Sequence, residues 1–162
     1  KKSKGDTAAS PVSKENLAIA KSWLASSDEY NLLVNGTAIT AFPVYYQNDL
    51  ALLRQSLRIV QAGTEVAEVK GKDLIPAHGL AMSRLLKTSV FSTEALTYEQ
   101  AIAYLRKEAI VLPPSVPKGY VLVTYKEIPL GFVKNIGNRA NNLYPQEWRI
   151  RSGYLPDDIR TL

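Results

Sequence analysis

The sequence predicts an α+β fold, and three observations lead to this class. First, 46% of the 162 residues are apolar and 22% are charged, which is typical of a soluble globular chain. Second, segments with helical apolar spacing alternate with segments typical of β-hairpins. Third, the stiff stretch 113–117 (PPSVP) separates a mixed α/β subdomain at 13–112 from a smaller β-rich subdomain at 113–162.

The first part of the chain predicts a helix and a hairpin. Ser13 is a typical N-cap, and the apolar residues that follow recur at helical spacing, so we expect a helix over 14–26 with Trp23 in the core. The segment 30–42 predicts a β-hairpin, because Asn35-Gly36 is the strongest two-residue turn signal.

Three further helices are expected before the break. Asn48-Asp49 caps the first, whose apolar face carries Leu50, Leu53, Leu57 and Val60. The stretch 59–70 indicates either a strand pair or one bulged strand that ends at Gly71. Pro76 is expected to open the next helix, at its first position. Thr97 and Gln100 form a capping box for the last helix.

The second part of the chain is expected to be mostly strand. We predict strands at 119–125, 128–136 and 148–151, with a turn at Lys126-Glu127 and a loop at 135–142. Gly131 and Gly137 are expected to allow a bulge or a tight turn.

Composition excludes several kinds of site. The chain has no Cys and a single His, His78, which argues against disulfides, thiolate metal sites, a Cys nucleophile and a Ser-His-Asp triad. We expect His78 at the surface or at a helix start. No stretch is apolar enough to span a membrane and no signal peptide is visible, and the lack of Cys fits a cytoplasmic protein.

The chain starts with Lys, and its first residues are small, polar and charged. We interpret residues 1–12 as an interdomain linker and the chain as a piece of a longer protein. The alternative is an otherwise complete protein that carries an artificial start.

Positive charge is denser toward the C-terminus. The formal net charge is +5, and residues 113–151 hold six Lys or Arg against two acidic residues. The segment 129–151 combines aromatic rings with four basic residues and four Asn, which is the chemistry that holds RNA. The candidate RNA-binding residues are Lys118, Lys126, Lys134, Arg139, Asn141, Asn142, Tyr144, Arg149 and Arg151.

Each candidate also has a purely structural interpretation. An Asn/Gly turn can satisfy its own backbone through its amides. Large aromatic residues are mostly buried in small β domains, so Tyr144 and Trp148 are expected in the core. Arg149 and Arg151 are expected on one face of the last strand, and that face fits either RNA or solvent.

The second part resembles a known family. The motifs GYVLVTY (119–125), PLGFVK (129–134) and NLYPQEWR (142–149) are similar to the PUA-like RNA-binding domain of RsmF-type rRNA cytosine-C5 methyltransferases, members of the Sun-type family. GTEVAEVKG (63–71) and IPAHGLA (75–81) resemble the region that joins the catalytic domain to it. The resemblance covers most of residues 14–151. It departs at two positions: Asn142 follows another Asn where Lys-Asn is frequent, and Trp148 stands where Leu is frequent.

The resemblance implies a linking subdomain followed by a small PUA-like β-barrel. It also implies a parent enzyme that binds S-adenosylmethionine and uses two catalytic Cys. This chain has no Cys and no glycine-rich cofactor loop, so we expect a non-catalytic fragment that binds no cofactor and positions rRNA for an upstream catalytic domain. The expected partners are small-subunit rRNA and that domain, and the fragment is expected to be a monomer that does not enter membranes.

Two other hypotheses compete with this one. In the second hypothesis, the region 13–112 is a protein-interaction module that docks on its own catalytic domain or on a ribosomal protein. A large exposed apolar patch there would favour this interpretation. The third hypothesis, a small stand-alone enzyme, has little support because no paired catalytic residues are visible.

Overall fold

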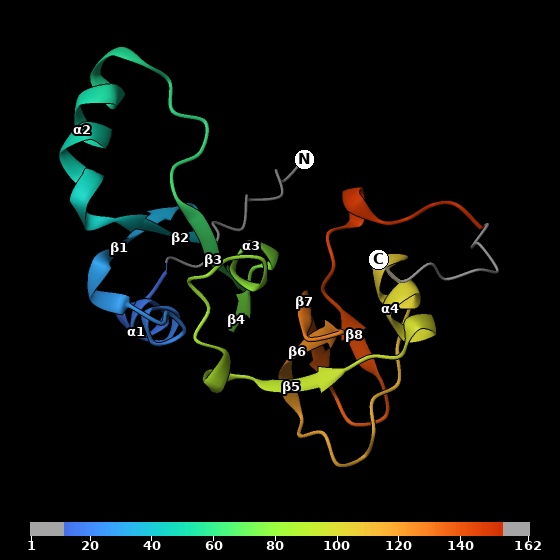
Figure 1. Cartoon of the computed structure of the whole chain (residues 1–162). Helices are drawn as coiled ribbons and strands as arrows, with labels where there is room; N and C mark the ends of the chain where they lie inside the picture. Colours follow the sequence, from blue (N-terminus) through green and yellow to red (C-terminus); the bar gives the residue numbers. More distant parts are fainter. Residues whose placement is uncertain (1–11, 154–162) are drawn as a thin grey trace, which may run out of the picture.

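The computed structural model describes residues 12–153 and confirms the α+β class. Two four-stranded sheets lie in the two halves of the chain, with short helices packed around them (Figure 1). The predicted linker at 1–12 therefore falls almost entirely outside the described residues. No described helix has the length and apolarity needed to cross a membrane.

The first sheet is antiparallel, with the strand order β1-β2-β3-β4. Its strands are β1 (Tyr30–Asn35), β2 (Ala38–Pro43), β3 (Thr64–Lys70) and β4 (Asp73–Pro76). The predicted first hairpin is present, but Asn35 pairs with Ala38, so the turn consists of Gly36 and Thr37. Gly36 takes the positive φ of 60° that such a turn requires. Of the two alternatives for 59–70, the single bulged strand is correct: β3 ends just before Gly71, and its pairing with β2 shifts register between Ile39 and Thr40.

Two helices of the first half pack on this sheet. Helix α1 (Lys14–Ser22) begins at Ser13, whose hydroxyl accepts a hydrogen bond from the Asn16 N–H at 3.0 Å. It ends earlier than predicted, at Trp23, which is buried as expected. Helix α3 (His78–Ala81) begins after Ala77 and not at Pro76. Pro76 instead pairs with Ala67 as the last residue of β4, where the missing proline N–H faces no partner strand.

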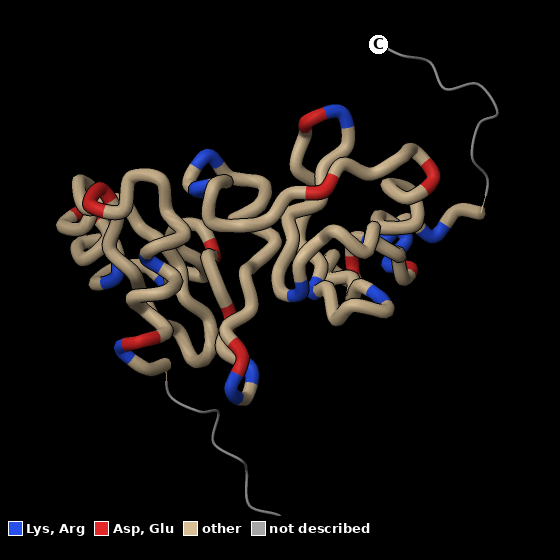
Figure 2. Tube along the Cα trace, turned by 90° about the horizontal axis from the view of Figure 1, so that it is seen from below, with Lys and Arg blue, Asp and Glu red and all other residues tan. Residues whose placement is uncertain are grey.

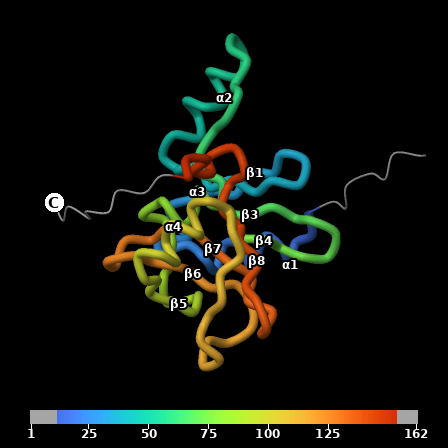
Figure 3. Tube along the Cα trace, turned by 90° about the vertical axis from the view of Figure 1, so that its right-hand side faces the viewer, coloured from blue at the N-terminus to red at the C-terminus, as the bar shows by residue number. Residues whose placement is uncertain are grey.

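Helix α2 (Gln47–Ser56) differs most from expectation. Tyr46 precedes its first residue, and Asn48-Asp49 lie inside the first turn instead of capping it. Of the predicted apolar face only Leu50 is buried, whereas Leu53, Leu57 and Val60 are exposed. Figures 1 and 3 show α2 projecting away from both sheets.

The second sheet has the order β5-β6-β7-β8. Its strands are β5 (Ser92–Ala95), β6 (Gly119–Tyr125), β7 (Ile128–Asn135) and β8 (Ala140–Asn142). β5 runs parallel to β6, and α4 (Tyr98–Leu105) lies in the connection between them. The sheet is open over the described residues, so the expected closed barrel is not present there. The Thr97–Gln100 capping box is confirmed.

The turns of the second sheet confirm one prediction and correct two. Lys126 and Glu127 form the β6–β7 turn and both have positive φ, as the right-handed strand twist favours. The predicted loop 135–142 is shorter, because 140–142 pair with β7 as strand β8. The predicted strand at 148–151 is absent. A 3-10 turn at Gln146–Trp148 takes its place, following Pro145, and irregular chain continues from there. Further 3-10 turns lie at Ser27–Glu29, Val44–Tyr46 and Thr88–Val90.

The two sheets divide the chain upstream of the Pro-rich stretch. Residues 92–105 supply β5 and α4, so they belong with the second sheet although they precede Pro113–Pro117. The boundary at 113 between the two predicted subdomains stays a prediction, and the sheets themselves separate between Pro76 and Ser92.

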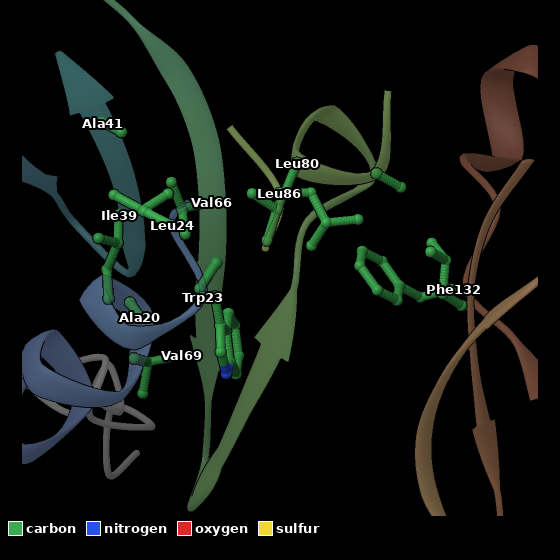
Figure 4. Close-up of a cluster of buried hydrophobic side chains, with 13 residues drawn as sticks. Ala20, Trp23, Leu24, Ile39, Ala41, Val66, Val69, Leu80, Leu86 and Phe132 are labelled. Carbon is green, nitrogen blue, oxygen red and sulfur yellow. The ribbon is translucent and has the colours of Figure 1, made fainter. Parts of the chain in front are cut away.

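The halves share part of their core. Leu122 and Phe132 of the second sheet pack into the cluster formed by the first sheet, α1 and α3. Figure 4 shows Phe132 reaching from its strand toward Leu80 and Leu86. A second cluster, around Tyr104 and Val121, lies under α4. The shared side chains hold β7 against α3, and this contact creates the cleft described below.

Candidate nucleic-acid interface

Two of the four Asn in the segment 129–151 are structural. The Asn135 amide donates to the carbonyls of Val116 and Pro117, and its Oδ1 accepts from Gly137 N–H at 3.0 Å. This side chain is buried and ties the chain before β6 to the end of β7. Such satisfied amides stabilise the fold and leave no group for RNA.

Asn142 repeats this arrangement. Its amide donates to the carbonyls of Tyr104 (2.8 Å) and Glu108 (2.9 Å), and its Oδ1 accepts from Tyr144 N–H at 2.9 Å. It therefore fastens β8 to the end of α4, as the structural alternative anticipated. Of the predicted amide contacts, Asn141 is the one that stays exposed.

Three of the predicted cations lie near the β7–β8 turn (136–139). Lys118 crosses Gly137, where an added Cβ would lie 2.8 Å from the Lys118 Cε. Lys118 and Arg139 are both exposed, and no described carboxylate lies within 4.0 Å of either. Lys134 is different, because its ammonium is 2.6 Å from Asp73 Oδ2 and 5.5 Å from the Tyr120 ring centre. The hydrogen bond that Lys134 donates to the Asp73 carboxylate raises the pKa of Lys134.

The other predicted cations lie elsewhere. Lys126 is in the turn at the far end of β6 from Lys118, with its ammonium 5.7 Å from the Tyr125 ring centre. Arg149 and Arg151 line a shallow hollow of about 350 Å³ beside Arg106 and Glu108. Figure 2 shows basic positions at several separate places and no continuous stripe. Of the predicted cations, Lys118, Lys134 and Arg139 therefore lie nearest the β7–β8 turn, whereas Arg149 and Arg151 form a separate group.

A cleft of about 900 Å³ opens between the two halves of the chain. One wall comes from the start of β3 and from Pro76–Gly79, and the other from residues 143–148 and Lys107. Trp148, which we expected in the core, lies on this wall with 60% of its surface exposed. Tyr144 is half-buried and packs against the second core cluster, so the core interpretation fits it better.

His78 lies between these two aromatic residues. Its ring centre is 5.2 Å from that of Tyr144 and 5.3 Å from that of Trp148, in edge-to-face geometry with both. The prediction that it starts a helix is confirmed, but it is half-buried and lines the cleft. Sequence reasoning missed this role, because a lone His gives no signal of which rings will surround it.

Burial lowers the pKa of His78, so its imidazole is neutral at pH 7. Its Nδ1 is buried with no hydrogen-bond partner among the described residues. A neutral ring carries one proton, and an unmatched N–H is costly to bury. We therefore assign the proton to Nε2 and leave Nδ1 as the unprotonated nitrogen.

Gly131 and Tyr104 pack closely against His78. Gly131 has φ 143°, and a Cβ there would lie 2.2 Å from the Tyr104 hydroxyl and 2.9 Å from His78 Nδ1. The Tyr104 hydroxyl donates to the Phe132 carbonyl at 3.1 Å. Burial raises the Tyr104 pKa, so this hydroxyl keeps its proton. Gly131, which we expected to allow a bulge or a tight turn, thus also permits the close approach of Tyr104 and His78.

The described residues contain no group of three His, Asp or Glu side chains arranged to hold a metal ion. Lys107 donates to the Tyr144 carbonyl, and burial lowers its pKa. What the surface does offer is exposed cations at the β7–β8 turn and, separately, an aromatic cleft.

Comparisons with known proteins identify the second half of the chain. The family model described as the methyltransferase RsmF PUA domain matches residues 91–150. Curated relatives include "Ribosomal RNA small subunit methyltransferase F" of Enterobacter sp. (strain 638), 29% identical over 138 residues that make up 85% of this chain and 27% of that protein. The protein of the same name from Shigella boydii serotype 4 (strain Sb227) is 30% identical over 114 residues, 70% of this chain and 22% of its own length. The chain thus spans about a quarter of the length of the curated relatives it matches.

Proposed function

Because this chain is a C-terminal region of the RsmF type, with its PUA domain at residues 91–150, we propose that it is the RNA-binding region of an rRNA (cytosine-C5) methyltransferase. The observation that carries this proposal is the family match over the part that contains Lys118, Lys134 and Arg139. Exposed cations on a small sheet attract the phosphates of structured RNA without reading its sequence.

We assign the first contact to Lys118 and Arg139. Both are exposed, both lie beside the β7–β8 turn, and neither is neutralised by a described carboxylate. Lys134 stands next to them but shares its charge with Asp73. Arg149 and Arg151 supply a second, separate group beside α4, and Asn141 remains a candidate for a sugar or base contact. Asn142 is left out, because its amide is fully engaged in the fold.

The reaction itself is assigned to the parent protein. The fragment is proposed to hold small-subunit rRNA while an upstream domain binds S-adenosylmethionine, extrudes the target cytosine and methylates it. In this proposal the fragment binds no cofactor and has no catalytic role. Its setting is the cytoplasm, and it acts as a monomer.

The test is RNA binding across a salt series. We expect the isolated chain to bind small-subunit rRNA fragments with an affinity that falls steeply as salt rises. Lys118→Ala and Arg139→Ala should each reduce the slope of log K against log salt by about one. Lys14→Ala and Lys21→Ala on α1 are matched controls, since they remove exposed cations far from the site in sequence. Tight binding in high salt, or no effect of the first two variants, contradicts the electrostatic contact.

The segment 44–60 favours a second role, protein docking. It places several large apolar residues in solvent: Val44, Tyr45, Tyr46, Leu52, Leu53, Leu57 and Val60. Tyr45 is 84% exposed and Val60 91%. Exposed apolar surface of this extent on a projecting helix is typical of an interaction site. We propose that the segment 44–60, called the arm below, packs against the upstream catalytic domain of the parent protein.

This second role has its own test. The upstream domain, expressed separately, should bind this chain, and Leu52→Glu or Leu57→Glu should weaken that binding. Val90→Glu, at another exposed apolar residue outside the arm, serves as the control. Self-association of the chain alone, measured by light scattering and removed by Leu52→Glu, would instead identify a second copy as the partner.

A further inference from the structure

The cleft that contains His78 is a separate feature from the cations at the β7–β8 turn. Its volume of about 900 Å³ falls in the range typical of small-ligand sites. Its walls belong to different halves of the chain, which the shared core around Phe132 holds together. Neither the salt-dependent contact proposed above nor the family match requires such a cleft.

Trp148 is the residue that calls for an explanation. It is 60% exposed, whereas the other tryptophan, Trp23, is 6% exposed. The ring centres of His78 and Trp148 lie 5.3 Å apart in edge-to-face geometry, with an interplanar angle of 79°. The indole thus contacts His78 while most of its surface faces solvent. An aromatic ring displayed in this way is the usual platform for an unstacked base.

The charges on the cleft walls argue against a phosphate as the occupant. Three carboxylates line the cleft and only two ammonium groups: Glu65, Glu68 and Glu147 against Lys70 and Lys107. One of these ammonium groups, that of Lys107, already donates to a backbone carbonyl. A flat, uncharged ring that carries amino groups at its edge suits these walls better, because carboxylates accept hydrogen bonds from such groups.

The remaining polar groups also match a nucleobase edge. Gln61 and Gln146 line the cleft, and each amide both donates and accepts hydrogen bonds. His78 adds a neutral ring with one N–H donor. Burial, with a smaller contribution from the neighbouring Glu68, raises the pKa of Glu65. The cleft therefore has a stacking surface and edge partners, with little to attract a backbone phosphate.

We propose that this cleft holds a single unpaired nucleobase of the bound RNA, stacked on Trp148. The inference rests on the proposed RNA-binding function and names a contact that the phosphate interaction does not supply. The cations at the β7–β8 turn hold the backbone, and the cleft selects RNA in which one base is free of its stack.

The test compares two RNAs and four proteins. One RNA is a hairpin with unpaired loop nucleotides, and the other is a fully paired duplex of equal charge. Binding of each is measured by fluorescence anisotropy to the wild-type chain and to Trp148→Ala, Trp148→Phe and Val111→Ala. We expect Trp148→Ala to weaken hairpin binding about tenfold and to leave duplex binding and the salt slope unchanged. Trp148→Phe should retain most of the affinity, and Val111→Ala, a control at an exposed apolar residue outside the cleft, should change nothing.

Abasic substitution of each loop nucleotide in turn gives a second measurement on the unaltered protein. One position should lose about tenfold in affinity, and the same substitution should have no further effect on Trp148→Ala. If no RNA binds the wild-type chain, the proposed function itself fails. If both RNAs bind and neither Trp148→Ala nor any abasic position matters, RNA binding stands and the nucleobase site is wrong. Equal weakening of hairpin and duplex by Trp148→Ala also overturns it.

Discussion

Gly131 is the position at which the cost of a substitution to protein stability follows most directly from the structure. Replacing it by Ala brings a Cβ to 2.2 Å from the Tyr104 hydroxyl and 2.9 Å from His78 Nδ1. Real Cβ contacts are almost never shorter than 3.0 Å, so the surroundings must shift. The backbone there also has φ 143°, which an L-residue rarely adopts.

The expected cost is the sum of these two effects. The unfavourable φ costs about 1–2 kcal/mol, and forcing a methyl group into a packed site costs about 1–3 kcal/mol. Gly131→Ala should therefore lower the free energy of unfolding by about 2–5 kcal/mol. Gly71→Ala is the matched control, because Gly71 has φ 63° but nothing within 4 Å of its added Cβ. That variant should lose only the conformational part, about 1–2 kcal/mol.

The assay is equilibrium unfolding in urea, with the two variants compared at constant m-value. A double-mutant cycle then assigns the clash. Tyr104→Phe alone removes the hydroxyl that donates to Phe132 and should cost about 1 kcal/mol. In the Gly131→Ala background, Tyr104→Phe also removes the hydroxyl oxygen that lies 2.2 Å from the added Cβ. The double variant should therefore lose less stability than the sum of the two single variants. Additive losses, or a Gly131→Ala variant as stable as Gly71→Ala, would refute the packing described here.

Three further predictions address the polar groups. Asn142→Ala removes a satisfied amide and should lower stability by about 1–3 kcal/mol in thermal unfolding, whereas Asn141→Ala should change it by less than about 0.5 kcal/mol. Burial depresses the pKa of His78, so its stabilising effect is complete above about pH 6.5 and declines as pH falls through the folded-state value; His78→Gln should flatten this part of the stability profile. Asp73→Asn should raise RNA affinity at low salt by releasing Lys134, and an unchanged affinity would show that Lys134 is no part of the interface.

Where local chemistry decides, the sequence was a good guide. The Thr97–Gln100 capping box, the Ser13 cap and the Lys126-Glu127 turn depend on residues within a few positions of each other, and all were predicted. The α+β class follows from such elements. The resemblance of the motifs in 119–149 to an RsmF-type PUA-like domain is confirmed by the family match over 91–150, whereas the subdomain bounds 113–162 stay a prediction.

Predictions that depend on tertiary context were less successful. Helical spacing of Leu53 and Leu57 identifies an apolar face on α2, but it does not reveal whether anything covers that face. The open second sheet was not predicted for the same reason, because closure of a sheet depends on tertiary contacts. Strand patterns give the strands and not their closure, and parallel pairing of β5 with β6 joins segments about 30 residues apart through α4. Neither the apolar spacing nor the composition of residues 92–125 indicates that β5 pairs with β6.

The C-terminal segment shows most clearly how far side-chain type alone can mislead. Its Asn residues suggested ligands because amides bind RNA, and its Trp suggested core because large rings are usually buried. In the fold, Asn142 satisfies three backbone groups and Trp148 stands in solvent beside His78. The sheet ends with β8 at Asn142, and the 3-10 turn after Pro145 then carries Trp148. A strand through 148–151 would have buried alternate residues, whereas the turn leaves the ring free, and this is why the cleft has an aromatic wall at all.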